Sequence, residues 1–298
     1  METRQTLDQL RKFEIPGVVT FNAGNGGLLR INLKTESSAA EMYLHGAHIT
    51  GFQKTSEPPL LYLSRLSHFA RDRAIRGGVP ICLPWFGTRA GDVMHGFARV
   101  TEWGVAETSA APKGGATVRL KLPGTAIRPP WPMFSAEFVL TVTDRLSMEL
   151  IVTNRSDRNL EFENCLHTYF NVGDVRDISL AGLKSAYYLD KTDQGARKPE
   201  IADAIRITAE TNRVYLDTTS TVEIHDAKFH RTVRVEKSGS TSTVVWNPWT
   251  TQAVPDDFDE YDYRRMICIE SGNVGPNKLK LTPGRVASLK VVLSSEPA

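Results

Sequence analysis

The chain has 298 residues, of which 41% are hydrophobic and 23% are charged, a composition typical of folded globular proteins and unlike that of disordered, collagenous or coiled-coil chains. Its 36 basic and 34 acidic residues give a net charge of +2. This near balance excludes the basic excess that is usual in proteins binding nucleic acids or anionic membranes, so we expect neither among its partners.

The compartment is predicted from the first twenty residues and from the cysteines. Residues 1–20 mix charged and apolar side chains and lack the apolar core of a signal peptide. Three cysteines, at 82, 165 and 268, are too few and too far apart for a disulfide framework, and each lies in an apolar run. These features predict buried, reduced thiols in a soluble cytoplasmic protein, and a monomer is the expected oligomeric state.

In chain order, the sequence predicts one short helix over 4–13 and then strands. Apolar and polar residues alternate with a period of two at 117–122, 138–143 and 146–153. Further strand-like runs occupy 28–33, 160–170, 213–217, 222–225, 232–236, 243–246, 265–270 and 287–293. Because no strand–helix unit repeats and no low-complexity linker intervenes, we expect an all-β protein, a large antiparallel β-sandwich forming a single domain over residues 1–298.

Two loops carry basic side chains suited to binding. Arg76 precedes two glycines and a proline-rich apolar segment, where glycines permit close backbone approach and prolines fix the loop. Its planar guanidinium can hold a phosphate or several hydroxyls, although an exposed arginine beside a structural loop is an equally good interpretation. Further along, His95 and Arg99 can line a polar pocket, but a single loop histidine is more often simply hydrogen-bonded.

Two strands carry candidate acid–base groups. In the run 160–170, alternation places His167 on one face with Glu163, Cys165 and Tyr169, a set too polar for a core. Histidine is tunable near neutral pH, so His167 is a candidate general acid, or else part of a polar cluster at a sheet edge. Glu270 ends an apolar strand, where burial favours a basic carboxylate and simple exposure to water is the plainer alternative.

Other motifs lead to weaker expectations. Trp246 and Trp249 flank an Asn-Pro turn, where they can stack on a sugar ring or fill the core. The chain has no phosphate-binding glycine motif, no HExxH and no CxxC. His45 and His48 are three residues apart, which places them on opposite faces of a strand, so we expect no metal site.

Five ordered segments together resemble one family. They are AIRGGVPICLPWFG (74–87), HGFAR (95–99), LHTYF (166–170), VVWNPW (244–249) and MICIESGNV (266–274). In identity and order they are similar to the D-hexose-6-phosphate mutarotases, or glucose-6-phosphate 1-epimerases, of the aldose 1-epimerase group. The resemblance implies a galactose mutarotase-like sandwich. It also implies an isomerase that interconverts the α and β anomers of a hexose 6-phosphate, chiefly glucose 6-phosphate, without a cofactor.

The resemblance also implies roles for single residues. His167 corresponds to the general acid at the ring oxygen, and Glu270 to the general base at the C1 hydroxyl. Arg76 and Arg99 correspond to arginines of the substrate site and would supply positive charge for a sugar phosphate. His95 would contact substrate hydroxyls.

Two positions depart from the family pattern. Met94 stands where glutamine often precedes HGFAR, which removes one polar contact. Asn212 stands where the family tends to have aspartate. The amide of Asn212 can accept from and donate to a substrate hydroxyl but carries no negative charge, so the hydroxyl preference is expected to differ.

Two other functions fit parts of the sequence. One is a non-catalytic sugar-phosphate binder or sensor on the same fold, against which the presence of both His167 and Glu270 argues. The other is a carbohydrate hydrolase or lyase that uses Glu270 with a second carboxylate such as Glu163 or Asp217. A histidine–glutamate pair fits that reaction less well than two carboxylates.

Overall fold

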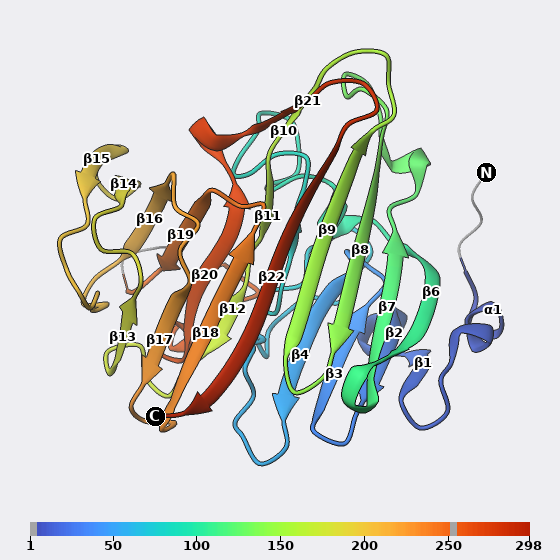
Figure 1. Ribbon diagram of the computed structural model, residues 1–298, viewed down its shortest axis with the longest axis horizontal. Coiled ribbons are helices and arrows are strands. Elements are labelled where there is room, and N and C mark those ends of the chain that lie inside the picture. Colours follow the sequence, from blue (N-terminus) through green and yellow to red (C-terminus); the bar gives the residue numbers. More distant parts are fainter. Residues whose placement is uncertain (1–4, 251–254) are drawn as a thin grey trace.

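The computed structural model describes residues 5–250 and 255–298. Curved sheets make up most of it, and the short helix α1 (Leu7–Leu10) lies at one edge (Figure 1). A capping box begins this helix, because Thr6 Oγ1 accepts from Gln9 N while the Gln9 side chain accepts from Thr6 N. The helix predicted over 4–13 is therefore shorter than expected and continues only as the 3-10 turn η1 (Arg11–Phe13), while Arg4 lies outside the described residues.

The first sheet is antiparallel and has four strands in chain order: β1 (Val19–Ala23), β2 (Leu29–Lys34), β3 (Ser38–Tyr43) and β4 (His48–Lys54). Only β2 matches a strand predicted from the sequence. Small residues dominate β3, and β4 buries the polar His48 and Thr50. Neither strand therefore shows the apolar–polar alternation on which the prediction relied.

The second sheet has eight strands in the order β13-β17-β18-β22-β9-β8-β7-β6. In β8 and β9 every second residue is buried along most of the strand, as the alternation predicted. The bounds are β6 (Gly104–Ala111), β7 (Gly115–Lys121), β8 (Phe134–Val142), β9 (Leu146–Asn154), β13 (Ile178–Ala181), β17 (Val222–Asp226), β18 (Arg231–Ser238) and β22 (Val286–Pro297).

The third sheet, here called the site sheet, follows the order β15-β14-β16-β19-β20-β11-β5, with β12 also paired to β20. Figure 1 shows β16, β19 and β20 side by side. The bounds are β5 (Ile81–Cys82), β11 (Asn164–Leu166), β12 (Tyr169–Asn171), β14 (Tyr187–Asp190), β15 (Ala196–Pro199), β16 (Thr211–Leu216), β19 (Ser242–Asn247) and β20 (Met266–Asn273).

The run 160–170 forms three strands rather than the single strand predicted. Its first part, β10 (Leu160–Phe162), pairs with β21 (Leu279–Leu281), whereas β11 pairs with β5 and β20, and β12 pairs with β20. β11 and β12 pair with β20 in the same register, and a tight turn separates them, in which Thr168 N donates to Leu166 O at 3.0 Å and His167 N donates to Pro80 O at 3.0 Å. His167 therefore lies in a bend between two strands, where its side chain is not bound to a strand's strict alternation.

One hydrophobic core connects the three large sheets. It contains Ile31 of β2, Leu150 of β9 and Ile269 of β20, all fully buried. In Figure 1 the four-stranded sheet lies behind the long strands β8 and β9, and β3 contacts β8. The fold is the large antiparallel β-sandwich that the sequence predicted. The remaining 3-10 turns are η2 (Asn25–Gly27), η3 (Ala98–Val100), η4 (Pro112–Gly114), η5 (Gly124–Ala126), η6 (Asp262–Arg265) and η7 (Gly275–Asn277).

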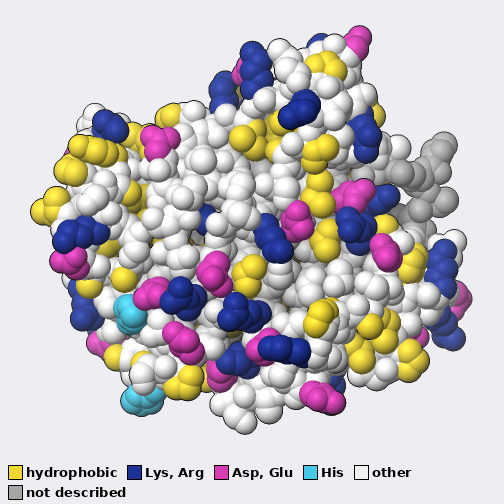
Figure 2. All heavy atoms as spheres, in the orientation of Figure 1, with side chains coloured by type: hydrophobic (Ala, Val, Ile, Leu, Met, Phe, Trp, Pro, Cys, Tyr) yellow, Lys and Arg dark blue, Asp and Glu magenta, His cyan; other side chains and the backbone are white. Residues whose placement is uncertain are grey.

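The surface mixes both signs of charge. Figure 2 shows Lys and Arg side chains lying among Asp and Glu side chains on one face. Ion pairs between charged side chains include Arg119 with Glu137 and Arg234 with Glu223. Among residues 5–250 and 255–298, no helix has the length and apolar character needed to cross a membrane.

Candidate active site

Glu270 owes its position to the alternation of β20. Ile267 and Ile269 of this strand belong to the main core, so Cys268 and Glu270 point to the other face of the site sheet. Glu270 is paired with Val244 of β19 and is only 1% exposed. A carboxyl group is therefore buried directly after the apolar run 266–269, and β20 continues beyond it to Asn273 rather than ending at Glu270 as predicted.

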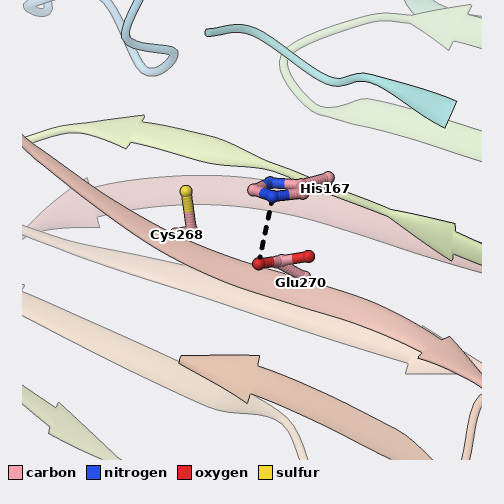
Figure 3. Close-up of side chains that lie close together, drawn as sticks. All are labelled: His167, Cys268 and Glu270. Carbon is pink, nitrogen blue, oxygen red and sulfur yellow. Dashed lines mark ion pairs between the residues drawn. The ribbon is translucent and has the colours of Figure 1, made fainter. Parts of the chain in front are cut away.

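His167 reaches Glu270 from the bend between β11 and β12. Its Nε2 lies 3.4 Å from Glu270 Oε1 (Figure 3). The side chain is largely buried, and within the described residues its Nδ1 has no hydrogen-bond partner. The structure thus brings the two residues expected to act as acid and base into contact, largely away from water.

Burial shifts the pKa values of this pair in opposite directions. It raises the pKa of Glu270 well above the usual 4.5, because desolvation penalises the carboxylate. It lowers the pKa of His167 well below the usual 6.5, and the nearby His95, Arg99 and Arg76 lower it further. Since both shifts favour neutral groups, the contact is not a permanent ion pair. The same shifts make the carboxylate a stronger base and the imidazolium a stronger acid.

Three aromatic rings surround the imidazole of His167. The Tyr169 ring stacks on it at 4.8 Å between centroids with an interplanar angle of 10°. His95 and Trp246 approach edge-on, at 5.3 Å and 6.2 Å. Packing on three sides fixes the ring plane and keeps Nε2 directed at Glu270.

His95 is held by two reciprocal hydrogen bonds with Gly87. His95 N donates to Gly87 O at 2.8 Å, and Gly87 N donates to His95 Nδ1 at 3.0 Å. Because Nδ1 accepts, the neutral ring carries its proton on Nε2. Burial, together with repulsion from Arg99 and Arg76, lowers the pKa of His95 to about 3. His95 is therefore a neutral hydrogen-bond donor beside His167.

Arg76 is anchored beside the same rings. Its Nε donates to Asp257 Oδ1 at 3.1 Å, and a terminal nitrogen donates to the Tyr169 hydroxyl at 3.3 Å. Gly78 allows the loop to pack closely, since its φ is +60° and a Cβ there would lie 2.0 Å from Ile49 O. Sequence reasoning missed Asp257, because it lies in an acidic segment that resembles an exposed turn.

Arg99 approaches the site from η3. Its Nε donates to Met94 O at 3.0 Å, and within the described part of the chain it forms no ion pair. Burial lowers its pKa, and so does the proximity of Arg76, while Asp257 acts in the opposite direction. Among the described residues, Asp257 is the carboxylate that acts on both guanidinium groups, so this end of the site favours an anion.

Asn212 lies two strands from Glu270 in the site sheet. It is opposite Trp246, which in turn is opposite Cys268. Opposing residues of antiparallel strands share a face, so half-buried Asn212 faces the same side as the pair. Trp249, the second candidate for sugar stacking, instead packs on Tyr263 with centroids 5.4 Å apart.

The three cysteines converge behind the pair. Cys82 of β5 is opposite Cys165 of β11, and the Cys165 thiol lies 3.7 Å from Glu270 Oε2. Cys268, His167 and Glu270 each offer one metal-ligating atom, and these three atoms lie within 4.8 Å of one another. All three thiols are free and buried, as the sequence predicted. Their convergence was not predicted, because it depends on the pairing of distant strands.

The other weighed residues have structural contacts. The Glu163 carboxylate accepts from Phe86 N at 2.9 Å and from Gly275 N at 2.6 Å, which joins two loops. Asp217 is exposed and has a φ of +53°. The geometry therefore offers a histidine–glutamate pair rather than the two carboxylates of a hydrolase. His45 and His48 are buried and contact the carbonyls of residues 73 and 77, at 2.7 Å and 2.8 Å.

Comparison with known proteins identifies the family of this chain. The profile of the aldose 1-epimerase family matches residues 30–294. The chain is 34% identical to a protein of Cenchrus ciliaris over 91% of this chain and 86% of that protein. It is 31% identical to a protein of Salmonella typhimurium over 78% of this chain and 79% of that protein. Both carry the provisional name glucose-6-phosphate 1-epimerase. A Salmonella typhimurium crystal structure, provisionally described as a mutarotase, is similar with a TM-score of 0.86 and 26% identity over 96% of each chain. The chain belongs to the aldose 1-epimerase family.

Proposed function

We propose that this protein interconverts the α and β anomers of a hexose 6-phosphate, with glucose 6-phosphate as the first candidate. The contact between His167 and Glu270 carries the proposal, since it places a buried acid and a buried base 3.4 Å apart in an aldose 1-epimerase chain. The names of the curated relatives support the choice of substrate.

The reaction needs two proton transfers at neighbouring oxygens. The neutral pair and the reactive pair, a Glu270 carboxylate beside a His167 imidazolium, hold the same number of protons, so the reactive form arises by proton transfer across the 3.4 Å contact. In this form Glu270 removes the proton from O1 as the C1 carbonyl forms and the C1–O5 bond breaks, while His167 delivers a proton to O5. Rotation about C1–C2 then exposes the other face of the aldehyde, and the same steps run backward. Because O1 and O5 are both bonded to C1, the two catalytic groups must lie close together. Each positioned acid or base contributes about 10²–10⁴-fold, and the chemistry requires no cofactor.

The phosphate is assigned to Arg76 and Arg99. Both guanidinium groups lie near the pair, and burial already opposes the charge of Arg99, so an anion would relieve their mutual repulsion. His95 Nε2 and the Asn212 amide are the proposed hydroxyl contacts. Met94 directs its backbone carbonyl to Arg99 and has an exposed side chain, so its sulfur is given no role.

The proposal also covers the domain organisation, the oligomeric state, the partners and the location of the protein. Residues 1–298 are treated as one domain, which the shared core of the three large sheets supports. The enzyme is proposed to act as a monomer on a small-molecule sugar phosphate, without nucleic acid or membrane partners. A cytoplasmic location fits a phosphorylated substrate and three thiols that remain free.

Exchange NMR at anomeric equilibrium tests the proposal with glucose 6-phosphate, glucose and galactose. We expect the wild type to accelerate exchange between the anomers of glucose 6-phosphate more than exchange between the anomers of glucose or galactose. Glu270→Gln and His167→Asn should each lower turnover by about 100-fold or more, and the double variant should be little worse than the poorer single variant. Circular dichroism and thermal unfolding check that the variants fold. Tight binding of glucose 6-phosphate without accelerated exchange would instead identify a sugar-phosphate sensor.

A further inference from the structure

Cys268 adds a soft ligand to the proposed catalytic pair. It precedes Glu270 by two residues on β20, so both side chains point to the same face of the site sheet (Figure 3). The sulfur of Cys268, a carboxylate oxygen of Glu270 and a ring nitrogen of His167 all lie within 4.8 Å of one another. The proposed proton transfers give this sulfur no task.

The surroundings of these atoms resemble those of a closed ligand set. Cys268 is fully buried and Glu270 is 1% exposed, whereas His167 keeps 7% of its surface accessible and is the most accessible of the three. The Nδ1 of His167 is buried and has no hydrogen-bond partner among the described residues. Three metal-binding groups of different types therefore share one small volume from which most water is excluded.

We propose that His167, Cys268 and Glu270 form a binding site for a thiophilic divalent cation of the zinc class, and that the bound ion inhibits the enzyme. Thiolate, imidazole and carboxylate together suit Zn²⁺, whereas Mg²⁺ and Ca²⁺ prefer sites made of oxygen ligands only. Three protein ligands leave a fourth position for water or a sugar hydroxyl.

The distances need only a small adjustment. Zn²⁺ binds sulfur at about 2.3 Å and nitrogen or oxygen at about 2.0–2.2 Å, so tetrahedral ligand atoms lie roughly 3.3–3.7 Å apart. His167 Nε2 and Glu270 Oε1 are already 3.4 Å apart. The sulfur must approach by about 1 Å at most, which a change in the Cys268 rotamer supplies.

The charges also balance. The Cys268 thiol and the Glu270 carboxyl each lose a proton to solvent as the ion binds, so Cys268 binds as the thiolate and Glu270 as the carboxylate. One Zn²⁺, one thiolate and one carboxylate sum to zero, so the bound ion adds no positive charge beside Arg76 and Arg99. The ion occupies the two atoms that exchange protons with the sugar, and it therefore competes with the reaction.

The other two cysteines provide matched controls. Cys82 is as buried as Cys268 and lies on the same face of the site sheet, opposite Cys165, but it is not one of the three converging ligands. Cys82→Ser therefore makes the same replacement as Cys268→Ser, a sulfur atom by an oxygen atom, at an equally buried position outside the proposed site.

The direct test measures binding without substrate. Isothermal titration of the purified full chain with Zn²⁺ should show one site, and Co²⁺ should give a thiolate-to-cobalt charge-transfer band in the near ultraviolet. Cys268→Ser and Cys268→Ala should weaken Zn²⁺ binding by at least about tenfold and abolish the band, whereas Cys82→Ser should leave both unchanged. The wild-type Co²⁺ spectrum reports sulfur ligation even where a Cys268 variant fails to fold. A Co²⁺ complex without this band, or equal Zn²⁺ affinity in folded Cys268→Ser and the wild type, overturns the site.

The inhibition arm rests on the proposed function and is measured separately. Zn²⁺ should slow glucose 6-phosphate exchange in the wild type and in Cys82→Ser, and a chelator should restore the rate. Cys268→Ser should need at least about tenfold more Zn²⁺ for the same inhibition. A wild type that binds Zn²⁺ through Cys268 but keeps its full rate overturns the inhibition. A wild type without any exchange activity overturns the proposed function, while the binding arm still decides on the metal site.

Discussion

At the scale of single residues, His167 and Glu270 have pKa values that differ from those of exposed histidine and glutamate side chains. The pKa of His167 lies well below 6.5, so the folded protein gains no proton there as the pH falls through 6.5. We therefore predict that kcat/KM stays level through pH 6.5 and declines only at lower pH. Exchange NMR across pH 5–8, corrected for the spontaneous reaction, checks this. An acidic limb near pH 6.5 that disappears in His167→Asn would contradict it.

The two arginines differ as targets for substitution. Removing Arg76 also leaves the Asp257 carboxylate without its partner, whereas Arg99 forms no ion pair within the residues described. Arg99→Ala is therefore the cleaner test of phosphate binding. It should lower kcat/KM for glucose 6-phosphate by about 10- to 150-fold more than for glucose, as expected from about 1.5–3 kcal/mol for a charged hydrogen bond.

Arg89 supplies the control for this prediction. Its guanidinium lies over the rings of Trp85 and Trp131 and pairs with Asp92, so its charge already has partners. Arg89→Ala should leave the preference for the phosphorylated sugar unchanged. Equal losses for glucose and glucose 6-phosphate in Arg99→Ala would show that this arginine does not recognise the phosphate.

At the scale of elements, the loop before η3 depends on one glycine. Gly96 has a φ of +80°, and a Cβ there would lie 2.0 Å from Leu83 O. Gly96→Ala should lower the free energy of unfolding by about 2 kcal/mol or more and reduce activity, because it displaces His95. Gly91 has a φ of +77° but no atom within 4 Å of its Cβ position. Gly91→Ala should thus cost only about 1–2 kcal/mol and keep the activity.

Chemical denaturation and exchange NMR of Gly96→Ala and Gly91→Ala separate the cost of backbone strain from the cost of the overlap between the new Cβ and Leu83 O. Both glycines share the left-handed backbone conformation, so the difference between the variants measures the overlap with Leu83. Equal stability and equal activity of the two variants would show that the loop moves to accept a Cβ.

The elements also show what a sequence can and cannot predict. The long strands β8 and β9 were predicted because one face of each is buried and the other is partly exposed. The run 160–170 was predicted as one strand, but β10 pairs with β21 whereas β11 pairs with β20, and a change of partner strand is not encoded locally. The second break, between β11 and β12, is a tight turn at His167 within one register on β20. β4 was missed, because buried His48 and Thr50 hide its period.

The same limit applies to the site. His167 and Glu270 were identified as candidates from their local patterns, and their contact is what the structure adds. The approach of Cys165 to Glu270 required the register between β11 and β20, which is not encoded locally, whereas Cys268 lies beside Glu270 because the two are two residues apart on β20. The roles of all these residues remain predictions.

At the scale of the whole molecule, buried histidines make stability depend on pH. His48 is fully buried, its Nε2 donates to Gly77 O, and burial lowers its pKa to about 3. Between pH 6.5 and about 3 the unfolded chain binds a proton at this residue and the folded chain does not. The free energy of unfolding should therefore fall as the pH drops below 6.5, by about 1.4 kcal/mol per pH unit from His48 alone.

His48→Gln tests this contribution, since the amide can still donate to Gly77 O. Denaturant unfolding at several pH values between 4 and 7 should show a slope that is shallower by about one proton. His230→Gln changes an exposed histidine and serves as the control. An unchanged slope in folded His48→Gln would contradict the prediction. His95, with a pKa lowered to about 3, acts in the same direction.

The reciprocal hydrogen bonds between Gly87 and His95 have a consequence for protein engineering. They join the two ends of the loop formed by residues 88–94. The position of His95 is therefore fixed by its hydrogen bonds with Gly87 and not by the residues at the tip of the loop. The tip is exposed, including Arg89 and Asp92. Loops of other length or composition can therefore be grafted between Gly87 and Met94 while the His95 imidazole keeps its place and the Met94 carbonyl still accepts from Arg99, which makes this segment the natural point at which to insert a label.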